Sequence, residues 1–213
     1  MMEPFIRNDQ YNFISYQTQV LINGYATVND LSVLQALKGL VQDKVTNLFD
    51  KLSPSQQTVL KPIEDIRDTE HAEDYLIGLK SYVIPFPTVN DHAVRKLFPK
   101  VKKLKTPDWE DIDFRDISYL GWNDYGQERK YMIAEYNGEL KGFRGTFKNS
   151  SKKGICTICN TFSSIGFYMS ESKGSAQGTF VKKGNYICQD SDECNDKLKN
   201  KEKLDDFILR INH

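Results

Sequence analysis

The first third of the chain has a helical pattern of hydrophobic positions. Apolar residues recur every three or four positions over residues 11–25 and again over residues 31–52, which places each set on one side of a helix. Because the connections between these stripes are short, the helices should pack as an antiparallel bundle of three or four. Local signals for helix ends are a stop at Asn23-Gly24, an N-cap at Asp30, and new starts at Ser53-Pro54 and Thr69.

The pattern changes after Pro85-Phe86-Pro87, a segment that cannot continue a helix. A helix is expected from Thr88 to about Phe98. Residues 131–136 have the composition of a strand, and Asn137-Gly138 is a strong hairpin turn, so residues 140–147 should return beside them. A last apolar stripe predicts a C-terminal helix that carries Leu204, Phe207, Ile208 and Ile211.

These patterns predict an α+β protein of two domains. We expect an N-terminal helical bundle over residues 1–86 and a C-terminal α/β domain over residues 87–213. A chain of 213 residues has room for two modest domains, at roughly 100–200 residues each. The charges change at the same boundary, since residues 1–87 hold 7 basic and 11 acidic side chains, and residues 88–213 hold 22 basic and 18 acidic ones.

The overall composition excludes several classes of protein. The chain has 29 basic and 29 acidic residues, so a cationic nucleic-acid coat does not describe it as a whole. No apolar run approaches the ~20 residues of a membrane-spanning helix, and the first thirty residues have no signal-peptide pattern. We therefore expect a cytoplasmic protein with no membrane partner. In that compartment, four Cys indicate metal or redox chemistry before structural disulfides.

The four Cys have the spacing of a zinc site. Cys156 and Cys159 form a C-x2-C pair; after a spacer of 28 residues, Cys188 and Cys194 form a C-x5-C pair. The spacer can form a β-hairpin, and residues 196–200 resemble the start of a helix. A knuckle, a hairpin and a helix in this order describe a treble-clef zinc finger, here at about residues 150–213. We expect one structural Zn²⁺ held by all four thiolates.

Other interpretations of these Cys remain open. Disulfides would fit the cytosol badly, and unrelated buried thiols would not all lie within 39 residues. Four thiolates leave no coordination position for water, so a catalytic zinc is not expected. No nucleophile elbow, phosphate-binding loop or dinucleotide fingerprint is present in the sequence. We therefore expect that the protein is not an enzyme.

Two charged segments allow several interpretations. Six cations lie between Arg95 and Lys105, where they could meet phosphates, meet an acidic protein face, or only surround a helix end in solvent. The acidic stretch from Asp108 to Asp116 lacks the Gly and the Glu that a calcium loop needs, and is read as a solvent face.

Apolar and basic residues flank the Cys pairs. Ile155, Lys183 and Tyr186 lie within five residues of a Cys in the sequence, and Phe207 belongs to the last helix. A small zinc module has little interior, so exposed aromatic residues beside a Lys indicate a protein-binding spot. We expect Lys183 and Tyr186 to be presented by a turn at Gly184-Asn185. For Phe207, packing beneath the zinc module is the alternative to a partner contact.

Several motifs together resemble the elongation-factor-G-binding proteins of Gram-positive bacteria, the fusidic-acid resistance family. The resemblance spans the chain and is specific from about Phe98 onward. The segments that carry it are Phe98 with KVKKLK at 100–105, SYLGWN at 118–123, RKY at 129–131, KGICTICN at 153–160 and VKKGNYIC at 181–188. The wide spacing of the second Cys pair also matches this family.

The resemblance implies a function and a set of contact residues. Members of this family are not enzymes; they bind elongation factor G through the zinc-bearing domain and speed its release from the ribosome, which relieves the block by fusidic acid. Lys183, Tyr186 and Phe207 match positions implicated in binding the factor. Ile155 also adjoins this site, where the family often has Phe. We expect a monomer that binds elongation factor G.

The competing function is direct binding to nucleic acid, through the zinc module and the basic segment 95–105. The sequence pI of about 6.8 disfavours this alternative, because nucleic-acid-binding domains usually have pI values above about 9.

Overall fold

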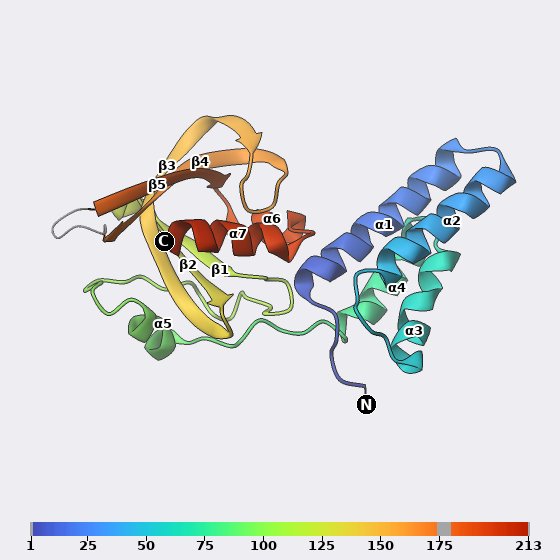
Figure 1. Ribbon diagram of the computed structural model, residues 1–213, viewed down its shortest axis with the longest axis horizontal. Helices are drawn as coiled ribbons and strands as arrows, with labels where there is room; N and C mark the ends of the chain where they lie inside the picture. Colours follow the sequence, from blue (N-terminus) through green and yellow to red (C-terminus); the bar gives the residue numbers. More distant parts are fainter. Residues whose placement is uncertain (1, 174–179, 213) are drawn as a thin grey trace. The chain divides into compact units, whose positions relative to one another are not determined.

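The computed structural model describes residues 2–173 and 180–212, and the chain divides into two compact units, Met1–Ile84 and Pro85–His213 (Figure 1). The division lies in the same segment as the predicted boundary between residues 86 and 87. The prediction of a two-domain α+β protein is confirmed, because the first unit is helical and the second combines a five-stranded antiparallel sheet with helices. None of the described helices is both long and apolar enough to cross a membrane.

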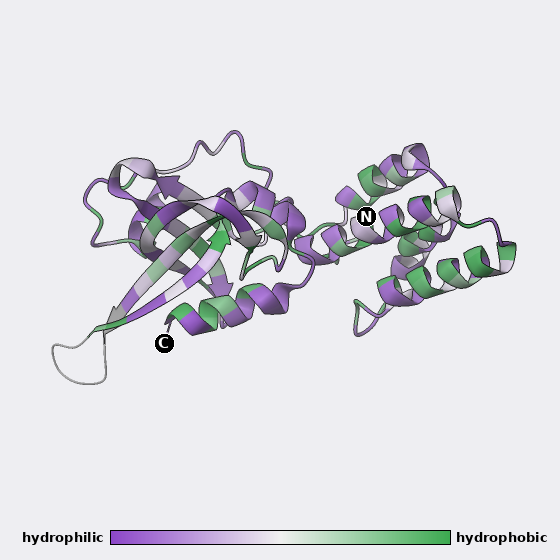
Figure 2. Ribbon diagram, turned by 90° about the horizontal axis from the view of Figure 1, so that it is seen from above, coloured by the Kyte–Doolittle hydropathy of each residue, from purple (hydrophilic) through white to green (hydrophobic). Residues whose placement is uncertain are grey.

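The first unit is a helical bundle. Its helices show hydrophobic and hydrophilic residues side by side, as amphipathic helices do (Figure 2). The apolar stripes meet in one core, which includes Ile14, Leu21, Val41, Ile63 and Leu79. The elements are α1 (Asn8–Thr27), α2 (Leu31–Thr46), α3 (Pro54–Leu60), the 3₁₀ turn η1 (Lys61–Asp65) and α4 (Thr69–Lys80).

Two of the predicted helix starts in this unit are confirmed by their hydrogen bonds. The Asp30 carboxylate accepts a hydrogen bond from the Ser32 amide at 2.8 Å, as an N-cap should. The Ser53 hydroxyl and the Gln56 side chain cap each other's backbone amides at the start of α3. These caps satisfy amides that would otherwise lack partners in the first turn.

Two other predictions of helix ends are wrong by one to four residues. The helix α1 continues through Asn23-Gly24 to Thr27, because Gly24 lies against α2: a Cβ atom there would be 2.3 Å from Leu37 Cδ2. Close helix packing, not a helix stop, therefore accounts for this glycine. The cap of α4 is Asp68, one residue before Thr69, and its carboxylate accepts from the His71 amide at 3.0 Å.

The second unit is built on an antiparallel meander whose strand order follows the sequence. The predicted hairpin is confirmed, and Asn137 and Gly138 have φ values of 54° and 76°, as a type I′ turn requires. The hairpin predicted between the Cys pairs is also present as β4 and β5. The strands are β1 (Leu120–Asp124), β2 (Arg129–Tyr136), β3 (Glu139–Ile155), β4 (Phe162–Lys173) and β5 (Phe180–Cys188).

Both faces of this sheet are covered near β2. Met132 and Ala134 point into the core beneath the C-terminal helix α7 (Lys201–Asn212). Tyr131 and Ile133 point into the opposite core, which contains residues of α5 (Asp91–Leu97). Burial on both faces explains why residues 131–134 are continuously apolar instead of alternating.

Two helices of this unit begin at positions other than those predicted. The helix expected from Thr88 begins at Asp91, because Asn90 caps it by accepting a hydrogen bond from the Ala93 amide at 3.0 Å. The helix expected at residues 196–200 is α6 (Ser191–Lys197), which Asp190 caps. The second Cys pair therefore spans the start of α6, with Cys188 before it and Cys194 inside it.

Candidate metal centre and partner-binding surface

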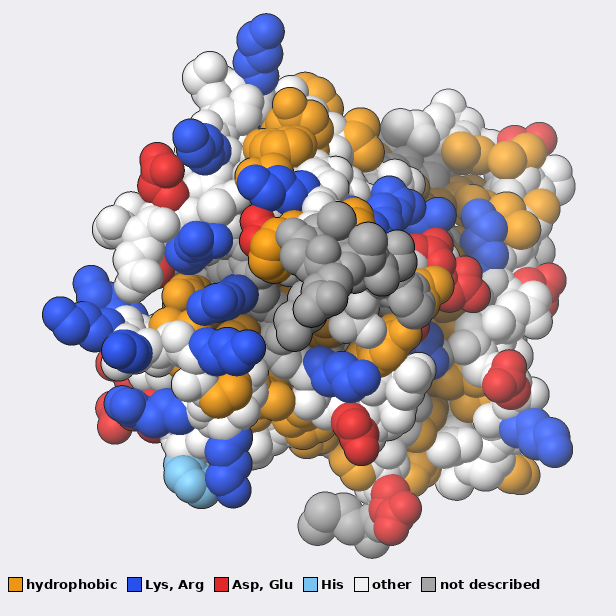
Figure 3. Space-filling model, turned by 60° about the vertical axis from the view of Figure 1, so that its left-hand side comes forward, with side chains coloured by type: hydrophobic (Ala, Val, Ile, Leu, Met, Phe, Trp, Pro, Cys, Tyr) orange, Lys and Arg blue, Asp and Glu red, His pale blue; other side chains and the backbone are white. Residues whose placement is uncertain are grey.

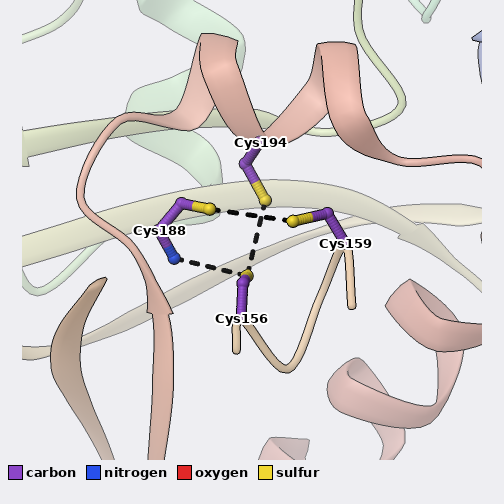
Figure 4. Close-up of side chains that lie close together, drawn as sticks. All are labelled: Cys156, Cys159, Cys188 and Cys194. Carbon is purple, nitrogen blue, oxygen red and sulfur yellow. Dashed lines mark hydrogen bonds between the residues drawn. The ribbon is translucent and has the colours of Figure 1, made fainter. Parts of the chain in front are cut away.

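Three segments of the second unit bring the four Cys together (Figure 4). Cys156 directly follows β3 and Cys159 ends the tight turn after it. The turn closes by a hydrogen bond from the Asn160 amide to the Cys156 carbonyl at 2.9 Å. Cys188 is the last residue of β5, and Cys194 lies in α6. The arrangement of knuckle, hairpin and helix is therefore the one predicted from the spacing.

The positions of the sulfur atoms fit a tetrahedral zinc ion. All four lie within 4.8 Å of one another. Cys156 and Cys194 are 3.8 Å apart, and Cys159 and Cys188 are 3.7 Å apart. A tetrahedron with Zn–S bonds of about 2.3 Å has sulfur atoms about 3.8 Å apart. Disulfides do not fit, because their S–S bond is about 2.05 Å long.

The electrostatics of the cluster also favour a cation over four bare thiolates. Contact with the Cys156 sulfur raises the pKa of the Cys188 and Cys194 thiols, so four thiolates cannot coexist here without a positive ion. The amides of Ile158 and Cys188 each donate to Cys156 Sγ at 3.3 Å. The four sulfurs fill the coordination sphere of a zinc ion and leave no site for a substrate, so this zinc is structural.

An amide side chain follows each ligand of the second pair and fastens it to the backbone of the sheet or of the segment that leads into β1. Gln189, after Cys188, donates to the carbonyls of Ser150 and Ile165 at 2.8 Å each. Asn195, after Cys194, accepts from the Ser118 amide and donates to the Tyr119 carbonyl. Sequence reasoning missed both residues, although an Asn or Gln directly after each ligand is visible in the sequence.

The four predicted partner-binding residues do not form one site. Ile155 and Tyr186 are exposed, at 57% and 51%. Lys183 and Tyr186 belong to the continuous strand β5, so the predicted turn at Gly184-Asn185 is wrong. Because side chains alternate along a strand, residues three apart lie on opposite faces, and Lys183 cannot share one face with Tyr186.

The structure corrects the expectation for Phe207. This side chain is only 1% exposed, and its ring lies 5.9 Å from that of Tyr168 in the core between α7 and the sheet. The alternative, packing beneath the zinc module, is therefore the observed one. A surface contact by Phe207 would need α7 to leave its place.

Exposed apolar residues flank the first Cys pair on both sides. Tyr186 pairs across β4–β5 with Phe167, with ring centroids 5.2 Å apart. Ile155 pairs across β3–β4 with Phe162, which is 61% exposed. The knuckle is fastened to β5 beside Tyr186, since the Thr157 amide and hydroxyl both donate to the Tyr186 carbonyl at 2.9 Å. Because Phe162 and Phe167 are five residues apart on β4, the two pairs lie on opposite faces of the sheet. We therefore call the Phe167–Tyr186 pair alone the knuckle surface.

The strands that carry the knuckle surface are rich in basic residues. Strands β3 to β5 carry eight basic and two acidic residues, and Lys148 lies directly across from Phe167. On the face shown in Figure 3, Lys and Arg side chains lie among exposed hydrophobic ones. Sequence reasoning missed Phe162 and Phe167, because only strand pairing brings them beside Ile155 and Tyr186.

The two charged segments lie elsewhere in the second unit. The six cations between Arg95 and Lys105 are all exposed, which leaves their three interpretations open. The acidic stretch of residues 108–116 borders a cavity of about 780 Å³. Three further acids, from the start of α6 and from within it, border the same cavity: Asp190, Asp192 and Asp196.

Comparisons with known proteins agree with this geometry. Residues 5–87 match the family model "Elongation factor G-binding protein, N-terminal", and residues 97–209 match "FBP C-terminal treble-clef zinc-finger". A solved structure, that of the fusidic acid resistance protein FusC, is 33% identical with a TM-score of 0.84, and the match covers 97% of each chain. The curated proteins include no match. The chain belongs to the family of elongation-factor-G-binding proteins with a C-terminal treble-clef zinc finger.

Proposed function

We propose that this protein binds elongation factor G and promotes release of the factor from the ribosome, which relieves inhibition of translation by fusidic acid. The observation that carries the proposal is the likeness to FusC over 97% of both chains at 33% identity. The similarity to FusC therefore extends over both the N-terminal region (residues 5–87) and the zinc-finger region (residues 97–209), and is not limited to the zinc module. The protein acts by binding and not by catalysis, since its zinc has no open position.

The knuckle surface is the proposed contact with the factor. Zinc and strand pairing hold its side chains in place before binding, so little conformational entropy is lost when a partner docks. Gly184 contributes to this order, because the Phe167 ring lies over it: a Cβ atom there would be 2.2 Å from Phe167 Cζ. Ordered, exposed aromatic rings of this kind supply much of the affinity in protein interfaces.

The charges on the strands around the knuckle surface indicate which kind of surface on elongation factor G would fit it. Eight basic and two acidic residues on β3 to β5 favour an acidic surface on the factor. Binding should therefore weaken as salt rises, because exposed charge pairs are screened. Lys183 contributes from the other face of β5, at the edge of this contact.

The test is a titration of the zinc-loaded protein with purified elongation factor G in the absence of ribosomes. One-to-one binding in the micromolar range or tighter supports the proposal. Binding to ribosomal RNA but not to the factor, with a steep salt dependence, would favour the nucleic-acid alternative instead.

Release needs a separate measurement. Ribosomes carrying the factor stalled by fusidic acid are mixed with the protein, and the factor left on pelleted ribosomes is followed over time. The proposal predicts faster loss of the factor and recovery of translation. Binding without faster loss would limit the function to binding alone.

A further inference from the structure

Lys130 is a fully buried lysine that the proposed function does not use. It lies on β2 and has no exposed surface. It alternates with Met132 and Ala134, so it points toward the core that contains the four Cys. A lysine rarely loses all contact with water, because burying an unpaired ammonium costs several kcal/mol.

The contacts of the Lys130 ammonium are neutral. Its Nζ donates to Asn123 Oδ1 and to the Gln189 carbonyl, both at 3.1 Å, and it lies 5.0 Å from the centroid of the Phe147 ring. Within residues 2–173 and 180–212, no carboxylate lies within 4.0 Å of this ammonium. The hydrogen bonds orient the charge but do not offset it.

The negative groups near Lys130 are three of the zinc ligands and the carboxylate of Asp190. One Zn²⁺ with four thiolates has a net charge of −2, in a core from which water is excluded. Burial lowers the pKa of Lys130 to about 8, and the negative charges of Cys194, Asp190, Cys188 and Cys156 oppose this shift. The carbonyl that accepts from Lys130 belongs to Gln189, the residue that directly follows Cys188.

Another lysine near the centre already has an anionic partner. Lys197 pairs with Glu193 on the same helix and donates to Ser163 Oγ at 3.0 Å. Its side chain is 33% exposed, so solvent also screens its charge. Lys130, in contrast, is buried, and no carboxylate of the described residues lies within 4.0 Å of its ammonium; the nearby Asp190 acts on it only from a longer distance.

We propose that Lys130 is the internal counter-charge of the zinc centre: its ammonium offsets part of the net negative charge of the four-thiolate site and, through Gln189, positions the segment that carries Cys188. Lys130 is thus a positioning residue that does not touch the metal. Its contribution does not depend on elongation factor G.

The first test is zinc affinity, measured on the full chain by competition with a chromophoric chelator. Lys130→Met keeps most of the length of the unbranched side chain and removes the charge. It should weaken zinc binding by about tenfold or more, as loss of an outer-shell partner does. Lys130→Arg retains the charge and should recover most of this loss. Lys148→Met removes an exposed lysine from β3 and is the control for net charge; it should change the affinity less than about twofold, as screened surface charges do.

A spectroscopic measurement separates charge from packing. In protein loaded with Co²⁺, the sulfur-to-cobalt charge-transfer band should move to lower energy in Lys130→Met, because a nearby cation stabilises the sulfur electrons. Lys130→Arg and Lys148→Met should keep the band of the unmodified protein. A role in packing alone predicts weaker metal binding in Lys130→Met without this movement.

Two results would overturn the proposal: a folded Lys130→Met with unchanged zinc affinity, or weaker affinity with an unmoved cobalt band. If Lys130→Met does not fold, Lys130→Gln gives the same comparison with a neutral side chain that can still hydrogen-bond. Loss of folding in both neutral variants, while Lys130→Arg folds and holds zinc, supports the proposal. The same loss in Lys130→Arg contradicts it.

Discussion

Replacement of Phe207 by Ala should destabilise the second unit instead of removing a surface contact. The ring is 1% exposed, lies 5.9 Å from the Tyr168 ring and belongs to the core beneath α7. Truncation of a buried Phe to Ala typically costs about 3–5 kcal/mol. A domain has only about 5–15 kcal/mol of stability in total. The melting temperature of this unit should therefore fall on the order of 10–20 °C.

Tryptophan fluorescence can assign this loss to the correct unit. Trp109 and Trp122, the two Trp of the chain, both lie in the second unit, and Trp122 stacks on Tyr131 with ring centroids 5.3 Å apart. Their emission therefore reports unfolding of this unit alone. Phe207→Leu is the matched variant; it keeps most of the buried volume and should lower the melting temperature much less.

The reasoning would be refuted by a Phe207→Ala variant that unfolds like the unmodified protein but binds elongation factor G weakly. That result would place the ring at the partner interface, as first expected from the resemblance. A lower melting temperature with intact binding at 20 °C supports the burial seen in the structure.

Three further predictions concern zinc, the division of roles and the order of the knuckle surface. Cys188→Ser should abolish stoichiometric zinc binding, which contributes about 10 kcal/mol to folding in small modules. The second unit should then unfold, as measured by Trp fluorescence, while the helical circular dichroism signal of the first unit persists. Residues 85–213 should bind elongation factor G and residues 1–84 should not; comparable binding by the first fragment would contradict the assignment. Gly184→Ala should displace the Phe167 ring and weaken binding to the factor several-fold at unchanged zinc content; unchanged binding would show that the position of this ring is unimportant.

The features that the sequence predicts best are those coded by neighbouring residues. Asp30 and Ser53 cap helices through their own local hydrogen bonds, and Asn137-Gly138 sets its own turn. The zinc ligands were predictable because the four Cys lie within 39 residues and begin with a C-x2-C pair, a spacing typical of a metal site. In each of these cases, residues close together in the sequence are enough to predict the structural feature.

Features that depend on distant partners could not be predicted from the sequence. Gly184-Asn185 resembles a turn, but pairing with Met169 and Tyr168 keeps it in β5. Phe207 and Tyr186 are both aromatic residues near the Cys, and only the place of α7 on the sheet makes one buried and the other exposed. Lys130 shows the same limit, because nothing local marks a lysine at the start of a strand as buried.

The central claim is that the knuckle surface binds elongation factor G, and one binding measurement tests it most directly. The dissociation constant for the factor is compared among the unmodified protein, Tyr186→Ala and Tyr125→Ala, all zinc-loaded. Tyr125 is 73% exposed in the same unit but outside the knuckle surface, so it controls for loss of an exposed tyrosine. Truncation of a central aromatic anchor costs about 2 kcal/mol, so Tyr186→Ala should weaken binding about thirtyfold and Tyr125→Ala should not. Equal affinity of Tyr186→Ala and the unmodified protein would contradict the claim.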